Sequence, residues 1–264
     1  MSGIWLHRIS HESDVSYPLF ERGYLSIGFS DFARDADFVK AMRDESGGDK
    51  WALFEAANDR IWSERYRGRY NLWRFLREFA VGDIVVVPSW GKFYICRITG
   101  EFQTAGAVDT AGLKDWNDKV VESDGASLRR NGKVVDIGFV RKIEMIGDPL
   151  SREEYADAKL SARMKIRQTN ADISDLRSNV ERAMDLAKSG KKLSYHRELT
   201  KQLRADALGV TREILAPGKF EEAVKWYLKK LGADEAYIPP KPKDDSEKRN
   251  GADADVIATF ESLK

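Results

Sequence analysis

The alternation of hydrophobic and polar positions changes character along the chain. In the first 150 residues, short apolar runs are separated by turn residues, which is typical of β-strands. The clearest pair is Asp83–Val87 and Phe93–Ile98, joined by the hairpin segment Pro88–Lys92. Four further segments have the same character: Gly3–Ile9, Tyr24–Phe29, Lys133–Phe139 and Arg141–Met145. We therefore expect a sheet made of these strands.

Two stretches between the strands have the spacing of helices. Residues 30–42 form one of them, and residues 49–79 form the other, with a break expected near Gly68. Strands with helices packed on them predict a mixed α+β fold for residues 1–150, in the form of a small curved sheet or barrel.

Helical patterns dominate from Ser151 onward. Ser151 begins a capping-box sequence that opens a helix, and apolar positions then recur at helical spacing as far as Leu208. This stretch is highly charged and has no strand of its own in the pattern. We therefore expect residues 151–212 to form a helical connector rather than an independent core.

The last segment, residues 213–264, has the pattern of a further domain. Lys219–Leu231 carries its apolar positions on one helical face, and Gly232 is placed to end that helix. A polar stretch that contains several prolines follows, and residues 251–260 are predicted to form a turn into a strand. A helix followed by a strand predicts the beginning of an α/β domain.

Charge and rare residue types narrow the classes of function. The 264 residues contain 44 Lys and Arg against 43 Asp and Glu, which excludes a uniformly basic nucleic-acid coat but leaves room for a local basic patch. A single cysteine, Cys96, and 3 histidines exclude a disulfide framework and a multi-Cys zinc site, so carboxylates would have to bind any metal. No apolar run approaches the ~20 residues that span a bilayer. We expect a cytoplasmic protein without membrane contact.

Two aspartates near the end of the chain carry the strongest chemical signal. Asp253 and Asp255 lie two positions apart at the start of an apolar strand, so their side chains would point to the same side. Phosphodiester hydrolysis uses a divalent ion to activate water and to offset charge on the phosphate, and Mg²⁺ prefers carboxylate ligands. The alternative is that both aspartates belong to a solvated turn, because Asp-X-Asp pairs are common.

The sequence around these aspartates resembles the opening of an Mrr-type restriction endonuclease domain, a member of the PD-(D/E)XK nuclease fold. The resemblance consists of Phe220-Glu221 on the helix, the stop at Leu231-Gly232, and the turn and strand Gly251–Ala258. It implies that Asp255 binds Mg²⁺ and is catalytic, and that Glu221 supports it. Asp253 is a further candidate metal ligand, although it stands where the family often has glycine.

The same family has Gln or an acid, one residue and then Lys on the strand after the metal-binding aspartate. This chain ends in Glu261-Ser262-Leu263-Lys264, whose spacing differs and which lies too near Asp255 to be across a hairpin. We therefore expect the catalytic lysine to lie beyond Lys264. The 264-residue chain by itself is then expected not to cleave DNA.

A second resemblance lies in the first part of the chain. The Gly82-Asp83 turn into an apolar strand, the Trp-bearing hairpin and the strand Tyr94–Gly100 look like the core of a PUA-like fold, the superfamily of the EVE and YTH domains. The segment Ile4–Leu6 is similar to the first strand of such domains. The resemblance implies a β-barrel whose sheet holds a pocket for a flipped or modified base.

Aromatic and polar side chains would line such a pocket, because an extruded base is held by stacking and by hydrogen bonds to its edge. The candidates are Trp90, Trp5, Tyr24, Trp73, Ser26 and Ser89. The barrel core is the alternative location for the aromatic residues. The barrel core is a less suitable location for Trp90, because this residue lies in a Pro-Ser-Trp-Gly loop.

A local basic cluster adds a third signal. The segment Arg60–Arg77 contains six arginines and one acid, Glu64, with tryptophans and tyrosines interleaved. Arginines contact phosphates and stack on bases, so this cluster could flank the mouth of a base pocket. The candidate backbone contacts are Arg65, Arg67, Arg69, Arg74 and Arg77. The alternative is a solvated helix face whose aromatic residues pack inward.

Together these features predict a Mg²⁺-dependent DNA endonuclease of a prokaryotic restriction system. Residues 1–150 would recognise DNA, and residues 213–264 would begin the nuclease domain. Residues 151–212 would connect these two parts. One alternative is a non-catalytic reader of RNA or of a modified base. Another is an interaction protein that forms a homodimer through the helices of residues 151–212.

Overall fold

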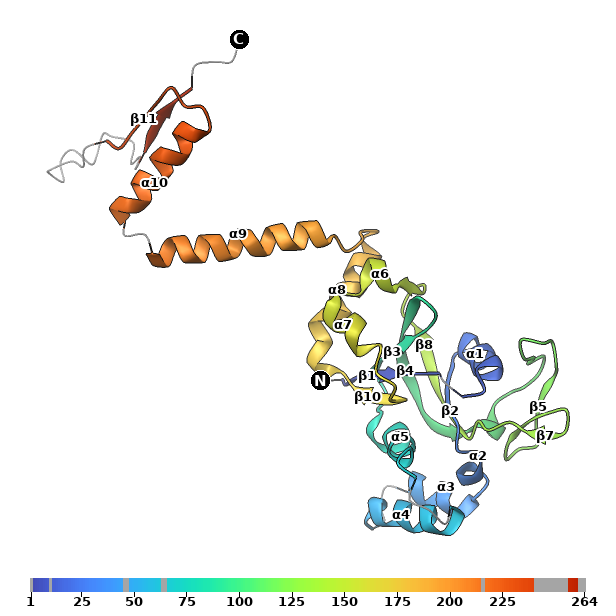
Figure 1. Cartoon of the computed structure of the whole chain (residues 1–264). Helices are drawn as coiled ribbons and strands as arrows, with labels where there is room; N and C mark the ends of the chain where they lie inside the picture. The colour runs from blue at the N-terminus through green and yellow to red at the C-terminus, as the bar shows by residue number, and fades with distance from the viewer. Residues whose placement is uncertain are drawn as a thin grey trace. The chain divides into compact units, whose positions relative to one another are not determined.

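The computed structural model of the chain describes residues 2–9, 11–44, 48–62, 66–214, 217–239 and 256–260 (Figure 1). Helices and strands alternate in a mixed α+β architecture with open sheets, so the predicted class is confirmed at this level. The chain divides into two compact units, Met1–Leu193 and Ser194–Lys264, which are described separately. Within the described ranges, no helix combines the length and the apolar character needed to cross a membrane.

The first unit is built on one large sheet. Its strands run in the order β10 (Asn170–Asp172), β1 (Ile4–His7), β3 (Ile84–Pro88), β4 (Lys92–Thr104), β8 (Phe139–Met145) and β2 (Tyr24–Ile27), and β9 (Leu150–Ser151) pairs with β4. The β1–β3 pair is parallel and the other pairs are antiparallel. The predicted hairpin is confirmed as β3–β4, with Val85 opposite Cys96.

Helices of the first half of the chain cover one face of this sheet. They are α1 (Ser13–Glu21), α2 (Ser30–Ala33), α3 (Ala36–Arg43), α4 (Lys50–Ile61) and α5 (Arg69–Trp73), and α5 continues into a π-helical turn at Arg74–Glu78. The helix predicted at residues 30–42 is split because Asp35 caps α3, its side chain accepting a hydrogen bond from the Phe38 amide. The break expected near Gly68 falls between α4 and α5.

The opposite face of the sheet carries a second core. Here α6 (Arg152–Tyr155), α7 (Ala158–Arg163) and α8 (Arg177–Lys188) follow the sheet strands, and β10 pairs with β1. Buried residues of these elements pack against the sheet: Leu160, Met164, Ile173 and Val180 contact the layer that contains Leu6 and Phe93. Residues 151–193 are therefore part of the first unit, which differs from the expected connector. Helical spacing locates an apolar face but not the surface that covers it.

A small sheet closes the side of the first unit next to α1. Its strands are β5 (Val121–Ser123), β6 (Leu128–Arg130) and β7 (Lys133–Val134), so the strand predicted at residues 133–139 is divided between β7 and β8. The Arg130 guanidinium forms ion pairs with Glu12, Asp14 and Asp115. These ion pairs hold the small sheet against α1.

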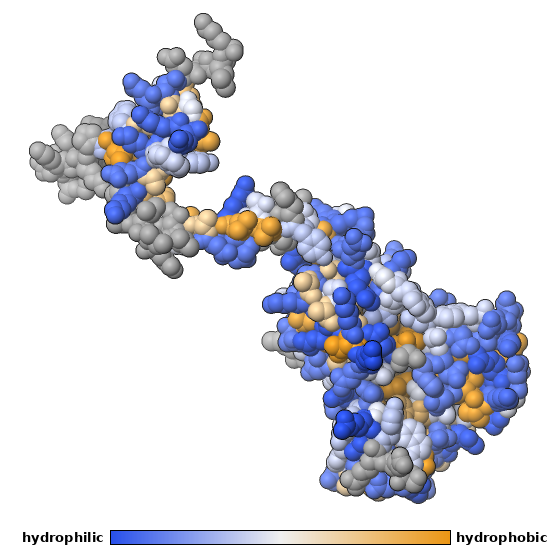
Figure 2. Space-filling model, in the orientation of Figure 1, coloured by the Kyte–Doolittle hydropathy of each residue, from blue (hydrophilic) through white to orange (hydrophobic). Residues whose placement is uncertain are grey.

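The second unit contains α9 (Tyr195–Ile214), α10 (Pro217–Lys230), β11 (Glu235–Tyr237) and β12 (Ile257–Thr259). The two strands pair antiparallel and both contact α10. Gly232 ends α10 with a positive φ of 96°, as predicted. Figure 2 shows apolar residues on the surface of α9. Leu199 and Leu203 of this helix are exposed. The homodimer alternative stays a prediction.

Candidate functional site

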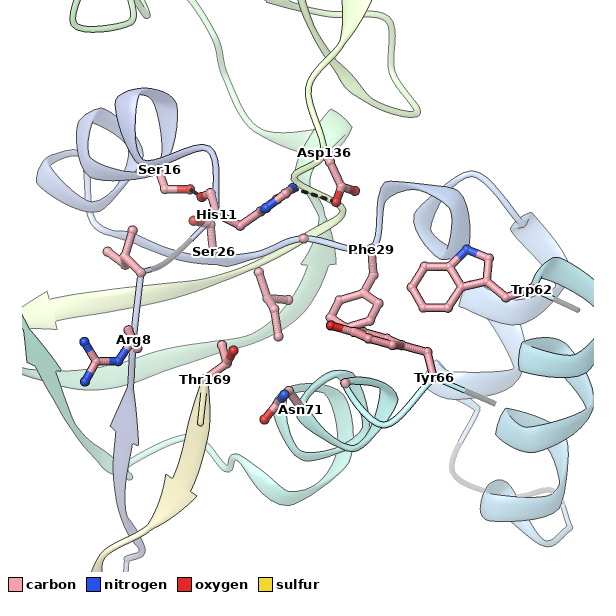
Figure 3. A pocket seen from close by; sticks show the side chains of 14 residues that line it. Arg8, His11, Ser16, Ser26, Phe29, Trp62, Tyr66, Asn71, Asp136 and Thr169 are labelled. Atoms are coloured by element: carbon pink, nitrogen blue, oxygen red, sulfur yellow. Dashed lines mark hydrogen bonds and ion pairs between the residues drawn. The ribbon is translucent and has the colours of Figure 1, made fainter. Parts of the chain in front are cut away.

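A cavity of about 230 Å³ lies in the first unit, where strand ends and helices converge (Figure 3). The residues that follow β1 and β2 form one wall, and Trp62, Tyr66 and Asn71 around α5 form the other. The loop that contains Asp136 closes a third side. Residues far apart in the sequence thus meet at this one place.

Three aromatic rings line one side of the cavity. The Phe29 ring stacks on Trp62, with ring centroids 5.6 Å apart and planes inclined by 30°. The Tyr66 ring meets Trp62 edge to face at 5.7 Å and is 58% exposed. The Trp62 indole N–H donates to Asp31 Oδ2 at 3.3 Å, which orients the indole. A flat ligand can stack against such a wall.

Phe29 lines the cavity from an unusual backbone conformation. Its φ is +68°, in the left-handed region that bulky side chains rarely adopt. The position is held because the Phe29 carbonyl begins α2 and the backbone of Gly138 packs directly against it, where a Cβ on Gly138 would overlap the Phe29 carbonyl group. Such conformations persist where the surroundings impose them, and they cluster at binding sites. Here the result is an aromatic ring that faces the cavity.

Polar groups of the opposite wall are buried without partners. Ser26 lines the cavity and is 4% exposed, and its buried hydroxyl has no hydrogen-bond partner among the described residues. The Arg8 Nε is also buried and has no hydrogen-bond partner among the described residues. Nη2 of the same guanidinium donates to the Met164 and Ile166 carbonyl oxygens at 2.6 and 2.9 Å. Most buried polar groups in proteins are hydrogen-bonded, so these two indicate a site for a polar ligand.

An ion pair stands at the edge of the cavity. His11 Nε2 lies 2.9 Å from Asp136 Oδ2. The other oxygen of Asp136 accepts hydrogen bonds from the Ser30 amide at 2.8 Å and from the Ser30 hydroxyl at 2.7 Å. Asp136 therefore ties its loop both to the segment before α1 and to the start of α2.

A buried histidine connects the two walls from behind. His7 Nε2 lies 2.9 Å from the Ser26 carbonyl oxygen, and His7 Nδ1 lies 2.6 Å from Asn170 Oδ1. The Asn170 side-chain amide donates to the Asn71 carbonyl oxygen at 2.7 Å. Complete burial lowers the pKa of His7 to about 4, although both hydrogen bonds favour the charged ring. A neutral imidazole thus supports the cavity at neutral pH.

A more open and more basic hollow adjoins the cavity and shares Gly68 and Asn71 with it. Arg67 and Arg74 contribute cationic side chains to this hollow. Arg67 is exposed, and Arg74 Nη1 donates to the Asn170 carbonyl oxygen at 3.1 Å. Arg69 is buried and bound to Glu55 Oε1 at 2.7 Å, and this hydrogen bond raises the pKa of Arg69. Three of the predicted arginines, Arg67, Arg69 and Arg74, therefore line the hollow beside the cavity, and Arg69 is held there by Glu55.

The other predicted arginines have different roles or locations. Arg77 Nη1 donates to the Met42 carbonyl oxygen at 3.0 Å, so it links the π-helical turn to α3. Arg65 lies outside the described residues. The cluster that looks continuous in the sequence is thus divided, because a helical segment turns its side chains in several directions.

The aromatic residues that the sequence favours for the pocket do not line the cavity. The indole of Trp5 is buried and donates to Asp83 Oδ2 at 2.9 Å, and its ring packs on Phe79. Trp73 packs edge to face between Trp51 and Phe54 in the main core. Tyr24 is half-buried against the core next to the small sheet. These three residues are structural, because neighbouring side chains cover their rings.

The hairpin residues Trp90 and Ser89 also lie away from the cavity. Trp90 is 71% exposed at the tip of β3–β4, and the Ser89 hydroxyl accepts a hydrogen bond from the Tyr17 hydroxyl at 3.2 Å. Of the predicted pocket residues, Ser26 is the one that lines the cavity. The other predicted pocket residues do not line this cavity, whose aromatic residues are Phe29, Trp62 and Tyr66.

The predicted nuclease residues are described only in part. Glu221 lies on α10, one residue after Phe220. Asp253 and Asp255 lie outside the described residues, and β12 begins two positions after Asp255. In the part of the chain that the structure describes, no three His, Cys, Asp or Glu side chains gather in a group that could hold a metal ion. The Mg²⁺ site stays a prediction.

Two signals in the sequence point to the cavity residues. Trp62 and Tyr66 stand among the arginines of the basic segment, and Phe29 directly follows a strand that ends in glycine. Phe29 and Trp62 come together through contacts between distant parts of the chain, which a local sequence pattern does not predict. Comparison with protein-family models, with curated proteins and with solved structures finds no match to this chain.

Proposed function

We propose that the first unit recognises DNA by taking one unstacked base, in modified or unmodified form, into the cavity at Phe29, Trp62 and Tyr66. The observation that carries this proposal is the buried, unpartnered Ser26 hydroxyl in a cavity that three aromatic rings also line. A nucleobase offers flat faces for stacking and a polar edge for hydrogen bonds. An apolar ligand would leave the Ser26 hydroxyl and Arg8 Nε without partners.

The adjoining basic hollow supports a nucleic acid over a free heterocycle. Arg67 and Arg74 lie beside the cavity, and Gly68 and Asn71 belong to both hollows. A base that enters the cavity remains attached to a phosphate on each side, and arginine is suited to bind such phosphates. The nearly neutral net charge of the chain is compatible with this local attraction.

The proposal includes a PUA-like fold for the first unit. The mixed sheet, the β3–β4 hairpin and the cavity at the ends of β1 and β2 support that assignment. The sheet is open in its strand order, so a closed barrel is not part of the proposal.

Direct binding measurements test the proposed base recognition. Labelled duplexes that are unmodified, modified at one cytosine or modified at one adenine are titrated with the full chain at one fixed salt concentration. We expect Trp62→Ala and Tyr66→Ala to weaken binding to the preferred duplex by about 1–3 kcal/mol. The matched control is Leu53→Ala, an exposed apolar residue of α4 that does not line the cavity. Equal weak binding of every duplex by wild type and variants would contradict base recognition.

We further propose that the second unit begins a Mg²⁺-dependent nuclease domain, which makes the whole protein a restriction endonuclease. The supporting observation is that α10, with Phe220 and Glu221, contacts an antiparallel pair of strands, one of which, β12, begins two positions after Asp255. Asp255, with Asp253 and Glu221, would hold Mg²⁺, which would activate water and stabilise charge on the phosphate.

Plasmid cleavage tests the nuclease proposal separately. Supercoiled DNA and Mg²⁺ are incubated with this chain and with any longer product of its gene. Asp255→Asn is expected to abolish cleavage, and Glu222→Gln, next to Glu221 on α10, serves as the control. Cleavage that survives Asp255→Asn would contradict the assignment. DNA binding without any cleavage in either form would favour the non-catalytic reader.

A further inference from the structure

Three aromatic side chains form an exposed cluster on the first unit, separate from the cavity. We define this aromatic platform as Tyr17, Trp90 and Trp116. Tyr17 lies under both indoles, with ring centroids 5.2 Å from Trp90 and 5.7 Å from Trp116, and the two indoles are 5.7 Å apart. Trp90 is 71% exposed and Trp116 is 52% exposed. Two neighbouring tryptophans at the surface indicate a contact site for a partner.

The platform is held in place by hydrogen bonds around it. The Tyr17 hydroxyl donates to Ser89 Oγ at 3.2 Å. Arg152 fastens the hairpin that carries Trp90, its amide donating to the Gly91 carbonyl oxygen at 2.9 Å and its guanidinium to the Ser89 carbonyl oxygen at 3.2 Å. The Trp116 amide donates to the Asp14 carbonyl oxygen at 3.2 Å. A partner therefore meets rings that are already ordered, which lowers the entropic cost of binding.

Two exposed lysines lie close to the platform residues in the sequence. Lys92 follows the Trp90 hairpin directly, and Lys119 lies in the loop after Trp116; both are exposed and form no ion pair with the described residues. The neighbouring acids Asp14 and Asp115 both pair with Arg130, which also pairs with Glu12, so Arg130 offsets their charge only in part. Exposed aromatic faces can stack the bases of a single-stranded nucleic acid, and unpaired lysines can bind its phosphates.

We propose that the aromatic platform stacks unpaired bases of single-stranded DNA. Base pairing and stacking in a duplex cover the faces that the indoles would need, so the ligand is an unpaired segment. Helix α1 carries Tyr17 of the platform and Ser16 of the cavity wall, so both sites belong to one part of the first unit. The inference goes beyond the proposed base cavity and rests on the proposed binding of DNA.

Fluorescence anisotropy with the full chain tests the platform. The probe is a labelled oligothymidine of about twelve nucleotides, within the site sizes common for single-strand binding. We expect the double variant Trp90→Ala/Trp116→Ala to bind it at least about fivefold more weakly than wild type. The matched control is Trp226→Ala, because this tryptophan of α10 is 63% exposed and belongs to the second unit. A circular-dichroism melt checks that each variant is folded.

Salt titration separates stacking from charge. Removing a stacked ring lowers the affinity but leaves the dependence of log K on log salt unchanged, whereas removing a phosphate contact such as Lys92 reduces that slope by about 1. The proposal is overturned if the double variant binds oligothymidine as tightly as wild type. It is also overturned if wild type binds no single-stranded DNA, or binds oligouridine in its place. Loss of modified-duplex binding in Trp62→Ala, together with unchanged oligothymidine binding in the double variant, would retain the cavity and reject the platform.

Discussion

Trp62 and Trp73 belong to the same arginine-rich segment, yet the structure uses them in opposite ways. Trp73 packs between Trp51 and Phe54, with ring centroids 5.0 and 5.5 Å away, and lines no part of the cavity. Trp62 stacks on Phe29 with one face and borders the cavity. The comparison teaches that two aromatic residues of one sequence segment can differ in whether the fold turns them toward a cavity or toward other aromatic rings.

The largest expected effect separates the two tryptophan environments by stability. Trp73→Ala should reduce the free energy of unfolding by about 3–4 kcal/mol, because it empties space inside a packed aromatic group. Tyr66→Ala, on the cavity side, should cost less than about 1 kcal/mol, because the ring is largely exposed. Urea denaturation measures both values. Equal losses would mean that the cavity rings are as structural as the core rings.

The second prediction concerns acid and the histidine behind the cavity. The unfolded His7 ring takes up a proton near pH 6.5, but the buried ring does so only near pH 4. The unfolded state therefore binds more protons between these values, and the free energy of unfolding falls by about 3 kcal/mol as the pH falls through that window. Urea titrations at a series of pH values measure the loss.

Two variants test whether His7 causes this pH dependence of the stability. His7→Gln should flatten the stability profile between pH 6.5 and pH 4. His11→Gln serves as the comparison variant, because His11 lies at the edge of the same cavity. A profile that stays steep in His7→Gln would show that another group titrates in this window.

The third prediction uses the unpartnered hydroxyl of the cavity. Ser26→Ala removes a buried group that has no hydrogen bond among the described residues, so stability should stay the same or rise by about 1 kcal/mol. Binding of the preferred DNA should weaken by a similar amount, because the ligand loses a partner. Thermal melts measure the change in stability, and anisotropy titrations measure the change in DNA affinity. A clear loss of stability would instead assign the hydroxyl to the core.

The smallest expected effect comes from the glycine under Tyr66. Gly68 has a φ of −61°, which alanine adopts easily, but a Cβ there would overlap the Tyr66 ring. Gly68→Ala should thus stabilise the fold slightly, by up to about 1 kcal/mol, through reduced freedom of the unfolded chain. It should also displace the Tyr66 ring and lower DNA affinity, by less than Tyr66→Ala does. Unchanged affinity would mean that Tyr66 does not contact the base.

Local features of the fold were predictable to different degrees. The β3–β4 hairpin followed from two apolar runs and a turn segment, and the end of α10 followed from Gly232. The position of residues 151–193 did not follow, because the spacing of Leu160 and Val180 indicates a helix face but not the sheet that covers it. Among the predicted pocket residues, Ser26 lines the cavity, Trp5 lies in the core, and Trp73 is half-buried against the core.

The order of apolar and turn residues by itself determined the β3–β4 hairpin, the helical stretches and the mixed class of this protein, because these depend on neighbours within a few positions. The tertiary structure alone decided which aromatic rings face open space. Phe29, Trp62 and Asp136 come from distant parts of the chain, and they meet only because the sheet brings the end of β2 beside the helices. A cavity is a property of the space between elements, and that space is set by packing over long sequence distances.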